Sequence, residues 1–358
     1  MLVEDVAWAK VKIVRDDGTW ADAQAPVIVS ASRSTDIPAF YADWFFYRLQ
    51  RGYSAWMNPF NGKKSFVSYQ HTRFIVFWSK YPAPLLPFLT ILKEKQINCY
   101  ILYTLNDYEK EGLEKGVPSV EKRIDTFKRL VDELGFGHVV WRFDPLMLTD
   151  QVDIPSLMEK VTSIGERLKG YTEKLVFSFA DISSYRKVKM NLDRNHILYR
   201  EWTEEEMDTC ARYLAELNRN WNYQLATCCE QIELAKYGIL HNCCIDDDLI
   251  IRLAYRDTEL MKFLGVEIRK MQPSLFGEEQ VPEDAIRLNG NLYAVKTKNN
   301  KDKGQRAFCG CINSKDIGEY NTCPHGCEYC YANATKERAV SNYRHYLQHK
   351  RDEMITGG

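Results

Sequence analysis

Short apolar runs rich in β-branched and aromatic residues alternate with helix-length amphipathic segments along most of this chain. Such alternation is typical of βα units, in which a crossover helix returns the chain so that successive strands pair in parallel. The pattern predicts an α/β fold of the (β/α)8 TIM-barrel-like type, which about 250 residues suffice to build. Strands are expected at 27–31, 53–57, 74–78, 100–104, 138–142, 175–179 and 223–227, with a weaker eighth near 239–244. Helices are expected at 41–51, 85–95, 120–134, 154–168 and 204–220.

Three cysteines near the C-terminus have the spacing C-x3-C-x2-C, in the run Thr322-Cys-Pro-His-Gly-Cys-Glu-Tyr-Cys-Tyr331. Thiolates are soft ligands that suit iron-sulfur clusters and zinc. Because so short a loop must fold around one object, Cys323, Cys327 and Cys330 are expected to bind three irons of a [4Fe-4S] cluster and to leave the fourth iron open. Gly326 allows the tight backbone path. Zinc remains the alternative, although zinc motifs usually come as two matched cysteine pairs.

Composition limits the other functions that this chain can have. Its 358 residues carry a net charge of -1, so no global basic field attracts nucleic acid. A nucleic-acid partner is therefore not expected. No uncharged apolar run reaches the length of a membrane span, and charged residues interrupt the N-terminal segment, so no membrane or export signal is expected. Eleven cysteines without an export signal indicate a reducing, cytoplasmic setting.

Polar residues follow the predicted strands one after another, which is where barrel enzymes assemble their active sites. Arginine and lysine would hold an anionic substrate or a methionine carboxylate, and carboxylates would hold ribose or substrate hydroxyls. The candidate catalytic residues are Arg33, Asp36, Lys80, Arg142 and Asp144. For Arg142 and Asp144, a purely structural ion pair at the barrel mouth is the alternative.

The cysteine motif resembles that of the radical S-adenosylmethionine enzymes, although there it normally lies near the start of the catalytic domain. In the late position of this motif, the chain resembles an uncharacterised bacterial family, domain of unknown function 1848. Several further blocks carry this resemblance from about residue 26 to about residue 333. They are Ser30-Ala-Ser-Arg-Ser-Thr-Asp-Ile-Pro38, Asn58-Pro-Phe-Asn61, Phe77-Trp-Ser-Lys80, Trp141-Arg-Phe-Asp-Pro145 and Asp316-Ile-Gly318.

The resemblance implies a barrel that carries a radical-SAM-like cluster at its end. The cluster would bind S-adenosylmethionine and generate a 5'-deoxyadenosyl radical that acts on a substrate in the barrel. Tyr329 would pack on the adenine, as its counterpart does in radical enzymes. Where those enzymes have a Gly-Gly-Glu-like stretch for the methionine amino group, this chain has Asn58 and the residues after it. The partners would be a substrate of unknown identity and a reductant such as flavodoxin or ferredoxin.

Further cysteines offer a second metal site. Cys309 and Cys311 form C-x-C, and two adjacent pairs, 228–229 and 243–244, follow the last predicted strands. One cysteine from each pair together with C-x-C would make a four-thiolate site for a second cluster or a zinc ion. The family resemblance selects Cys228 and Cys244, because its members have a cysteine two residues before a glutamate and another directly before Ile-Asp. The alternative is that these cysteines are small apolar core residues.

The chain is therefore expected to have three parts: a (β/α) barrel at 1–271, a linker or hairpin excursion at 272–306, and a cysteine-rich iron-sulfur segment with a C-terminal helix at 307–358, the cysteine loop capping the strand ends. A radical-SAM-like enzyme is the leading hypothesis. A non-enzymatic iron-sulfur electron-transfer or sensor protein, with Cys309 or Cys311 as the fourth ligand, stays open beside it. A zinc-stabilised nucleic-acid-binding protein is the third hypothesis, and the neutral charge balance disfavours it.

Overall fold

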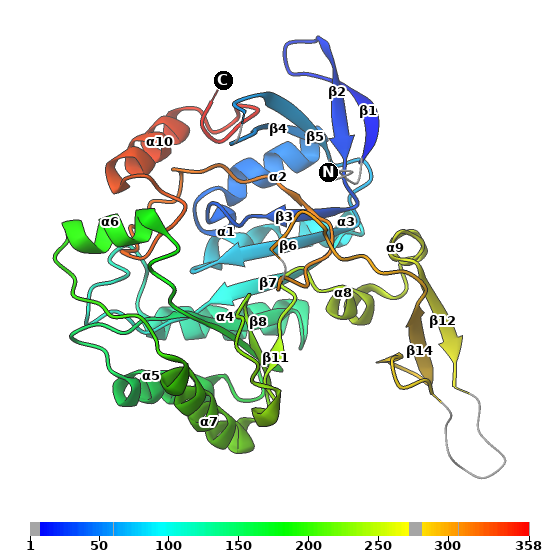
Figure 1. Ribbon diagram of the computed structural model, residues 1–358. Helices are drawn as coiled ribbons and strands as arrows, with labels where there is room; N and C mark the ends of the chain where they lie inside the picture. The colour runs from blue at the N-terminus through cyan, green and yellow to red at the C-terminus, as the bar shows by residue number, and fades with distance from the viewer. Residues whose placement is uncertain (1–7, 60, 272–280, 307, 358) are drawn as a thin grey trace.

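The centre of the protein is an eight-stranded sheet in which every neighbouring pair is parallel (Figure 1). The computed structural model describes residues 8–59, 61–271, 281–306 and 308–357. Across the sheet the order is β11 (Leu240–His241), β10 (Gln224–Thr227), β9 (Lys174–Phe179), β8 (Val139–Leu146), β7 (Asn98–Thr104), β6 (Phe74–Ser79), β3 (Ile28–Ala31) and β15 (Lys315–Asp316). Most of these strands are buried on both faces, as parallel strands covered by crossover helices must be.

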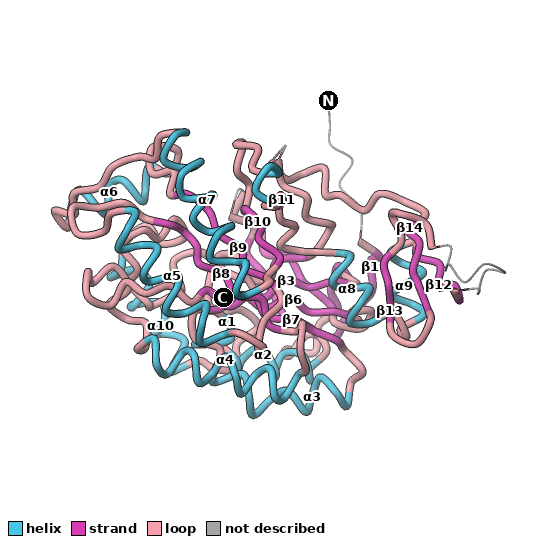
Figure 2. The backbone as a smooth tube through the Cα atoms, turned by 90° about the horizontal axis from the view of Figure 1, so that it is seen from below, coloured by secondary structure: helices cyan, strands magenta, loops and turns pink. Residues whose placement is uncertain are grey.

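Amphipathic helices cover one face of the sheet (Figure 2). They pack against the outward-pointing side chains of the strands, such as Val29, Ile75 and Ile101, in one large apolar core. These helices are α2 (Ala42–Arg51), α3 (Leu89–Glu94), α4 (Val120–Leu134), α5 (Ile154–Leu168) and α7 (Glu204–Trp221). The expected helices at 120–134 and 154–168 are confirmed at both ends, and the expected helix at 85–95 is a 3-10 turn, Ala83–Phe88, followed by α3.

The opposite face of the sheet has a smaller core. Side chains that alternate with the first set, such as Ile28, Val76 and Val140, pack there against α8 (Asp247–Ala254) and α9 (Thr258–Leu264). Asp246 starts α8 by accepting hydrogen bonds from two backbone N–H groups of its first turn. Three of the thiols discussed below, those of Cys244, Cys309 and Cys311, are buried in this core.

The structure has the parallel sheet of the predicted barrel, but the described residues do not close it into a barrel. In the described part of the chain, β11 pairs with β10 alone and β15 with β3 alone, so the two edges do not pair with each other. Each of these edge strands is two residues long and offers little ladder for closure. One backbone hydrogen bond spans this opening, from Ile312 N to Ile245 O at 3.0 Å. We call this opening between β11 and β15 the seam.

The strand expected at 53–57 forms as β4 (Tyr53–Met57), but its predicted place in the parallel sheet is wrong. It belongs to a four-stranded sheet with β1 (Ala9–Val14), β2 (Trp20–Ala25) and β5 (Lys64–Ser68), where it pairs antiparallel with β5. The reason is the connection, because a hairpin turn with Asn58 N bonded to Lys63 O at 3.0 Å reverses the chain at once. The short strand β15 fills the remaining place in the parallel sheet.

The rest of the chain adds to these layers. A three-stranded antiparallel sheet joins β12 (Val266–Lys270), β14 (Leu292–Lys296) and β13 (Ile286–Leu288), within and just before the predicted excursion at 272–306; residues 272–280 lie outside the described residues. The remaining helices are α1 (Ile37–Phe40), α6 (Arg186–Arg194), the 3-10 turn Ala235–Tyr237 and α10 (Lys336–Gln348). Within the described ranges, no helix is long and apolar enough to cross a membrane.

Candidate metal centres at the carboxyl edge of the sheet

Two groups of thiols lie at the carboxyl edge of the parallel sheet. The loop thiols are Cys323, Cys327 and Cys330, which the structure brings beside residues that follow β3, β6 and β7. The thiol ring is formed by Cys228 and Cys229 after β10, Cys244 after β11, and Cys309 and Cys311 before β15. Both groups therefore occupy the edge at which parallel α/β proteins place their functional residues.

The cysteine loop is held by backbone hydrogen bonds to the segments around it. Tyr41 OH donates to Thr322 O at 2.5 Å, and Asn333 Nδ2 donates to Cys323 O at 2.8 Å. Gly116 N donates to His325 O at 2.9 Å, and its own carbonyl faces His325 Nδ1 at 3.2 Å. Gly326 has φ +67°, the left-handed conformation that glycine adopts without strain. The loop is thus fixed in position without relying on its thiols alone.

Replacing Gly116 by alanine is expected to displace the cysteine loop, because a Cβ at this position would lie 2.4 Å from the carbonyl oxygen of His325. Overpacking of this kind typically costs about 1–3 kcal/mol. We expect Gly116→Ala to lower the urea midpoint and the metal content of the purified protein together. The control is Gly112→Ser, a nearby loop position where only the flexible end of Lys115 is within 4 Å, although its φ of +65° adds local strain. An unchanged metal content in Gly116→Ala would contradict this close-packing argument.

Burial raises the pKa of two of the loop thiols, Cys323 and Cys327. It raises the pKa of Cys327 to about 12, although the ammonium of Lys80 opposes this shift. Burial also raises the pKa of Cys323, and the negative charges of Asp36 and of the other two loop thiols act in the same direction. Among the described residues, no hydrogen bond joins one loop thiol to another, although their charges interact. Three thiols that are near but not in contact fit a multi-atom cluster better than one ion, because each iron of a cubane takes its own thiolate.

A buried polar network contacts the cysteine loop at Tyr329. Lys80 Nζ lies 2.6 Å from Glu114 Oε1 and donates to Tyr329 OH at 2.8 Å. Asn106 Nδ2 donates to Tyr329 OH at 2.9 Å and to Glu114 at 3.2 Å. Arg123, which is fully buried, reaches Glu114 at 3.5 Å, and its Nη2 donates to Asn106 O at 2.8 Å. Glu114 is thus the centre of the network, and the Lys80 and Arg123 charges hold its pKa at about 2.

Sequence reasoning missed Glu114 and Arg123. Glu114 stands in a loop with several other charged residues, and Arg123 lies on the buried face of α4, where an apolar residue is the ordinary expectation. A charged residue at an otherwise apolar helical position is the signal that could have found Arg123. Tyr329, predicted to pack on an adenine, is only 9% exposed, and its hydroxyl also donates to Glu114 in this network.

Asp36 acts as a junction between three segments. Its carboxylate caps α1 by accepting from Ala39 N at 3.0 Å. It also accepts from Ser79 Oγ at 2.6 Å and from Lys80 N at 2.8 Å, both at the end of β6. His325 of the cysteine loop faces the same carboxylate at 2.9 Å. With both oxygens engaged, Asp36 positions the loop against the strand ends.

Arg33 and Arg142 lie beside the thiol ring. Each guanidinium stands over the ring of Trp78, at 5.6 Å for Arg33 and 5.4 Å for Arg142. Arg142 is buried, pairs with Asp144, and donates to Cys244 Sγ at 3.1 Å. Arg33 Nη1 donates to Gln305 Oε1 at 3.0 Å, while its buried Nε has no hydrogen-bond partner among the described residues. Arg33 therefore retains one free donor at this edge.

The thiol ring brings together five sulfurs from three segments that are far apart in sequence. Cys228 Sγ lies 3.5 Å from Cys244 Sγ. Cys311 Sγ accepts from the backbone N–H of Cys244 at 3.2 Å, and Cys229 and Cys309 lie close enough to the other sulfurs of the ring for their charges to interact. The four cysteines that were predicted to form a second site thus lie together, with Cys229 as an additional neighbour. All five are free thiols.

Two further observations concern the predicted sites. In the described ranges, no three His, Cys, Asp or Glu side chains already converge on one point as a formed ion site. Asn58, the predicted cofactor residue, lies in the turn between β4 and β5 and not at the carboxyl edge of the parallel sheet, because β4 belongs to another sheet. Its position therefore lends the predicted role no support.

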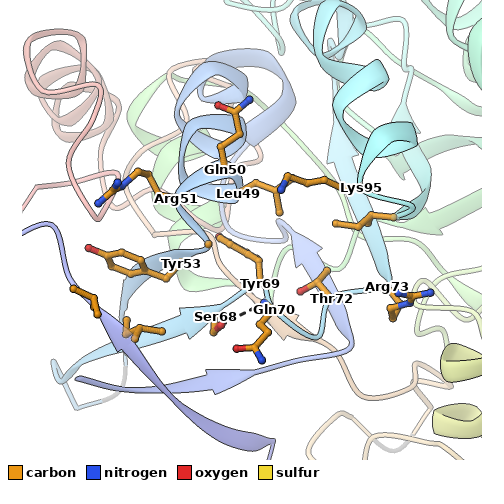
Figure 3. A pocket seen from close by; sticks show the side chains of 14 residues that line it. Leu49, Gln50, Arg51, Tyr53, Ser68, Tyr69, Gln70, Thr72, Arg73 and Lys95 are labelled. Carbon is orange, nitrogen blue, oxygen red and sulfur yellow. Dashed lines mark hydrogen bonds between the residues drawn. The ribbon is translucent and has the colours of Figure 1, made fainter. Parts of the chain in front are cut away.

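A separate cavity of about 530 Å³ opens at the other edge of the sheet (Figure 3). Gln70, Thr72 and Arg73 precede β6, and Lys95 precedes β7, so the cavity lies at the amino ends of these strands. Its arginines are already paired, Arg51 with Asp16 at 2.8 Å and Arg73 with Asp257 at 2.7 Å. This cavity is therefore distinct from both thiol groups.

The fold and the site define a parallel α/β protein that gathers two groups of thiols at the carboxyl edge of its main sheet. The chain belongs to the family described as domain of unknown function DUF1848, which matches residues 28–332. No curated protein gives a significant match. The crystal structure of a candidate alpha-L-fucosidase from Bacteroides thetaiotaomicron is similar over 52% of this chain and 82% of that chain, with 13% identity and a TM-score of 0.24, which is too low to carry an argument.

Proposed function

We propose that this protein is an iron-sulfur protein of the radical-SAM-like class. Cys323, Cys327 and Cys330 would hold three irons of a [4Fe-4S] cluster, and the fourth iron would be open to S-adenosylmethionine. The observation that carries the proposal is that three thiols of one short loop, one buried and two partly buried, lie close enough for their charges to interact, over the ends of β3, β6 and β7. When bound, the cluster and its cofactor would supply hydrogen-atom abstraction.

The residues around the loop suit this group chemically. Lys80 and Arg123 place positive charge beside Cys327, which favours the thiolate that binds iron. The Asp36–His325 contact and the Glu114 network fix the loop, so that its ligands are held before the cluster assembles. The parallel sheet would support the site as the strands of a TIM barrel do, with the seam in the place of the last strand pairing.

The substrate would bind between the loop thiols and the arginines. Arg33 has an unpaired buried N–H, and a fully buried donor without a partner is costly unless a ligand engages it. An anionic group, either the methionine carboxylate or a substrate acid, would meet this donor. Arg142 and Asp144 form an ion pair with each other. Their proposed role is therefore to orient the groups around that anion. A reductant such as flavodoxin or ferredoxin would be the redox partner.

A second candidate is a non-enzymatic electron-transfer or sensor protein. The observation that favours it is the burial of Tyr329, whose hydroxyl is already engaged by Lys80, Asn106 and Glu114. An aromatic ring so enclosed offers little surface to an adenine. The predicted fourth ligands for this case, Cys309 and Cys311, are engaged with the other cysteines of the thiol ring.

Anaerobic purification followed by electron paramagnetic resonance of the reduced protein separates these two candidates. The enzyme hypothesis expects about four irons and four sulfides per chain and a spectrum that changes when S-adenosylmethionine is added, because the open iron gains ligands. An unchanged spectrum of an intact cluster would favour the carrier or sensor. Zinc without iron at the loop thiols would overturn the iron-sulfur proposal.

A further inference from the structure

The thiol ring is at the seam of the parallel sheet. Cys228 and Cys244 follow β10 and β11 on one side of the seam, and Cys309 and Cys311 precede β15 on the other side. Cys311 Sγ accepts the backbone N–H groups of Cys244 at 3.2 Å and Ile245 at 3.3 Å, across the seam. These contacts stand next to the backbone hydrogen bond from Ile312 N to Ile245 O. Sulfur contacts thus take the place of strand pairing there.

N–H groups are directed at two sulfurs of the ring, those of Cys244 and Cys311, in an arrangement that favours thiolates. Besides the two backbone N–H groups on Cys311, Arg142 Nη1 donates to Cys244 Sγ at 3.1 Å and Asn242 Nδ2 donates to it at 3.3 Å. A neutral thiol is a weak acceptor, whereas N–H groups directed at a thiolate form charge-assisted bonds. Arg142 is already paired with Asp144, which leaves Arg33 as one further positive charge near Cys311, too little to balance several thiolates. A bound cation would supply the missing positive charge.

We propose that Cys228, Cys244, Cys309 and Cys311 bind one thiophilic divalent ion of the zinc class, which fastens the seam of the sheet. The spacing of the sulfurs selects a single ion over a second cubane. A tetrahedral zinc site with Zn–S bonds of about 2.3 Å separates neighbouring sulfurs by about 3.8 Å. The Cys228–Cys244 distance is 3.5 Å, and Cys311 Sγ lies 3.2 Å from the backbone N of Cys244. A cubane takes one thiolate on each iron and spreads them further apart.

The ion would act on the fold and not on the chemistry of the loop thiols. Its ligands come from segments that are otherwise joined by little backbone pairing. Because the unfolded chain has no preformed site, the ion binds the native state preferentially and so stabilises it. Cys244, Cys309 and Cys311 are also members of the smaller core with α8, so the ion would hold β15 and α8 to the end of the sheet. This ion site does not require a cluster at the loop thiols.

The test uses a full-length variant that lacks the loop thiols, Cys323→Ala with Cys327→Ala and Cys330→Ala. We expect this variant to lose its iron and sulfide but to keep about one zinc-class ion per chain. Adding Co²⁺ to the metal-free variant should give the intense visible bands of a tetrahedral thiolate site at one equivalent. Iron with sulfide at the ring, or the absence of stoichiometric Zn²⁺ or Co²⁺ binding by the metal-free protein, would overturn the proposal while leaving the loop-thiol proposal intact.

Single substitutions in the same background assign the ligands. Cys244→Ser and Cys311→Ser should each reduce the bound ion at least tenfold and lower the melting temperature by roughly 5–10 °C, an effect sized for a chain of this length. Cys243→Ser is the matched control, because Cys243 neighbours Cys244 but lies outside the ring. Cys229→Ser should also retain the ion, and loss of the ion in that variant would overturn the assignment of the four ligands. If Cys244→Ser does not fold, the Co²⁺ titration of the parent decides the outcome.

Discussion

Replacing Cys327 by alanine should reduce the iron content from about four atoms per chain to nearly none, with loss of the cluster spectrum. Cys327 is the most enclosed of the loop thiols, and it is the one beside Lys80 and Arg123. Two remaining thiols cannot hold a cubane firmly, because each ligand removed leaves an iron exposed to exchange. The measurement is iron and sulfide analysis of anaerobically purified protein, with circular dichroism to establish that the chain stays folded.

The control for this variant is Cys210→Ala. Cys210 is a buried thiol on α7, and burial alone raises its pKa to about 12, so it has the same chemistry without a metal partner. This control should keep its full iron content. A Cys327→Ala protein that retains about four irons and an unchanged spectrum would show that the cluster lies elsewhere. It would also remove the principal support for the function proposed above.

Replacing Glu114 by glutamine should destabilise the protein by about 3–5 kcal/mol, since it leaves two buried cations without their partner. Lys80 lies 2.6 Å from Glu114, and the fully buried Arg123 lies 3.5 Å from it. Glutamine keeps the size of the side chain, so the change isolates the charge. Urea unfolding at pH 7 measures the effect. The control is Glu121→Gln, an exposed carboxylate paired with Arg167, which should leave the urea midpoint unchanged.

The same carboxylate predicts how stability depends on pH. The folded state holds the pKa of Glu114 at about 2, whereas the pKa of an unpaired glutamate is about 4.5. A lowered pKa stabilises the folded protein above the unfolded value, and this contribution of about 3 kcal/mol is lost as the pH falls from 4.5 through 2. Wild-type stability should therefore fall over this range more steeply than that of Glu114→Gln. Parallel curves for the two proteins would contradict the role assigned to Glu114.

Local signals in the sequence specified the elements of secondary structure well. The apolar periodicity of 120–134 and 154–168 defined both ends of α4 and α5, and Asp36 with Pro38 begins α1. Such signals act between residues within a few positions of one another, and therefore survive without knowledge of the fold. The pairing partner of a strand is a long-range property. Nothing within Tyr53–Met57 distinguishes a parallel strand from the antiparallel β4 that the hairpin turn produces.

In the candidate site, too, some residues could be predicted from local sequence signals and others only from the fold. The spacing of Cys323, Cys327 and Cys330 is contained in one loop, so the sequence alone nominated them as a group. The five cysteines of the thiol ring come from three segments, and the predicted four could be chosen only through a family resemblance. Glu114 and Arg123 were missed because their burial and their contact depend on how α4 packs beside the loop after β7.

By itself, the sequence determined the alternation of strands and helices and the short cysteine loop, because periodicity and ligand spacing are encoded between near neighbours. Only the tertiary structure decided which strand fills the eighth place in the sheet, where the seam lies, and that thiols from both of its sides meet there. Those outcomes depend on contacts between residues as distant as Cys244 and Cys311, and such contacts follow from the packing of the whole chain.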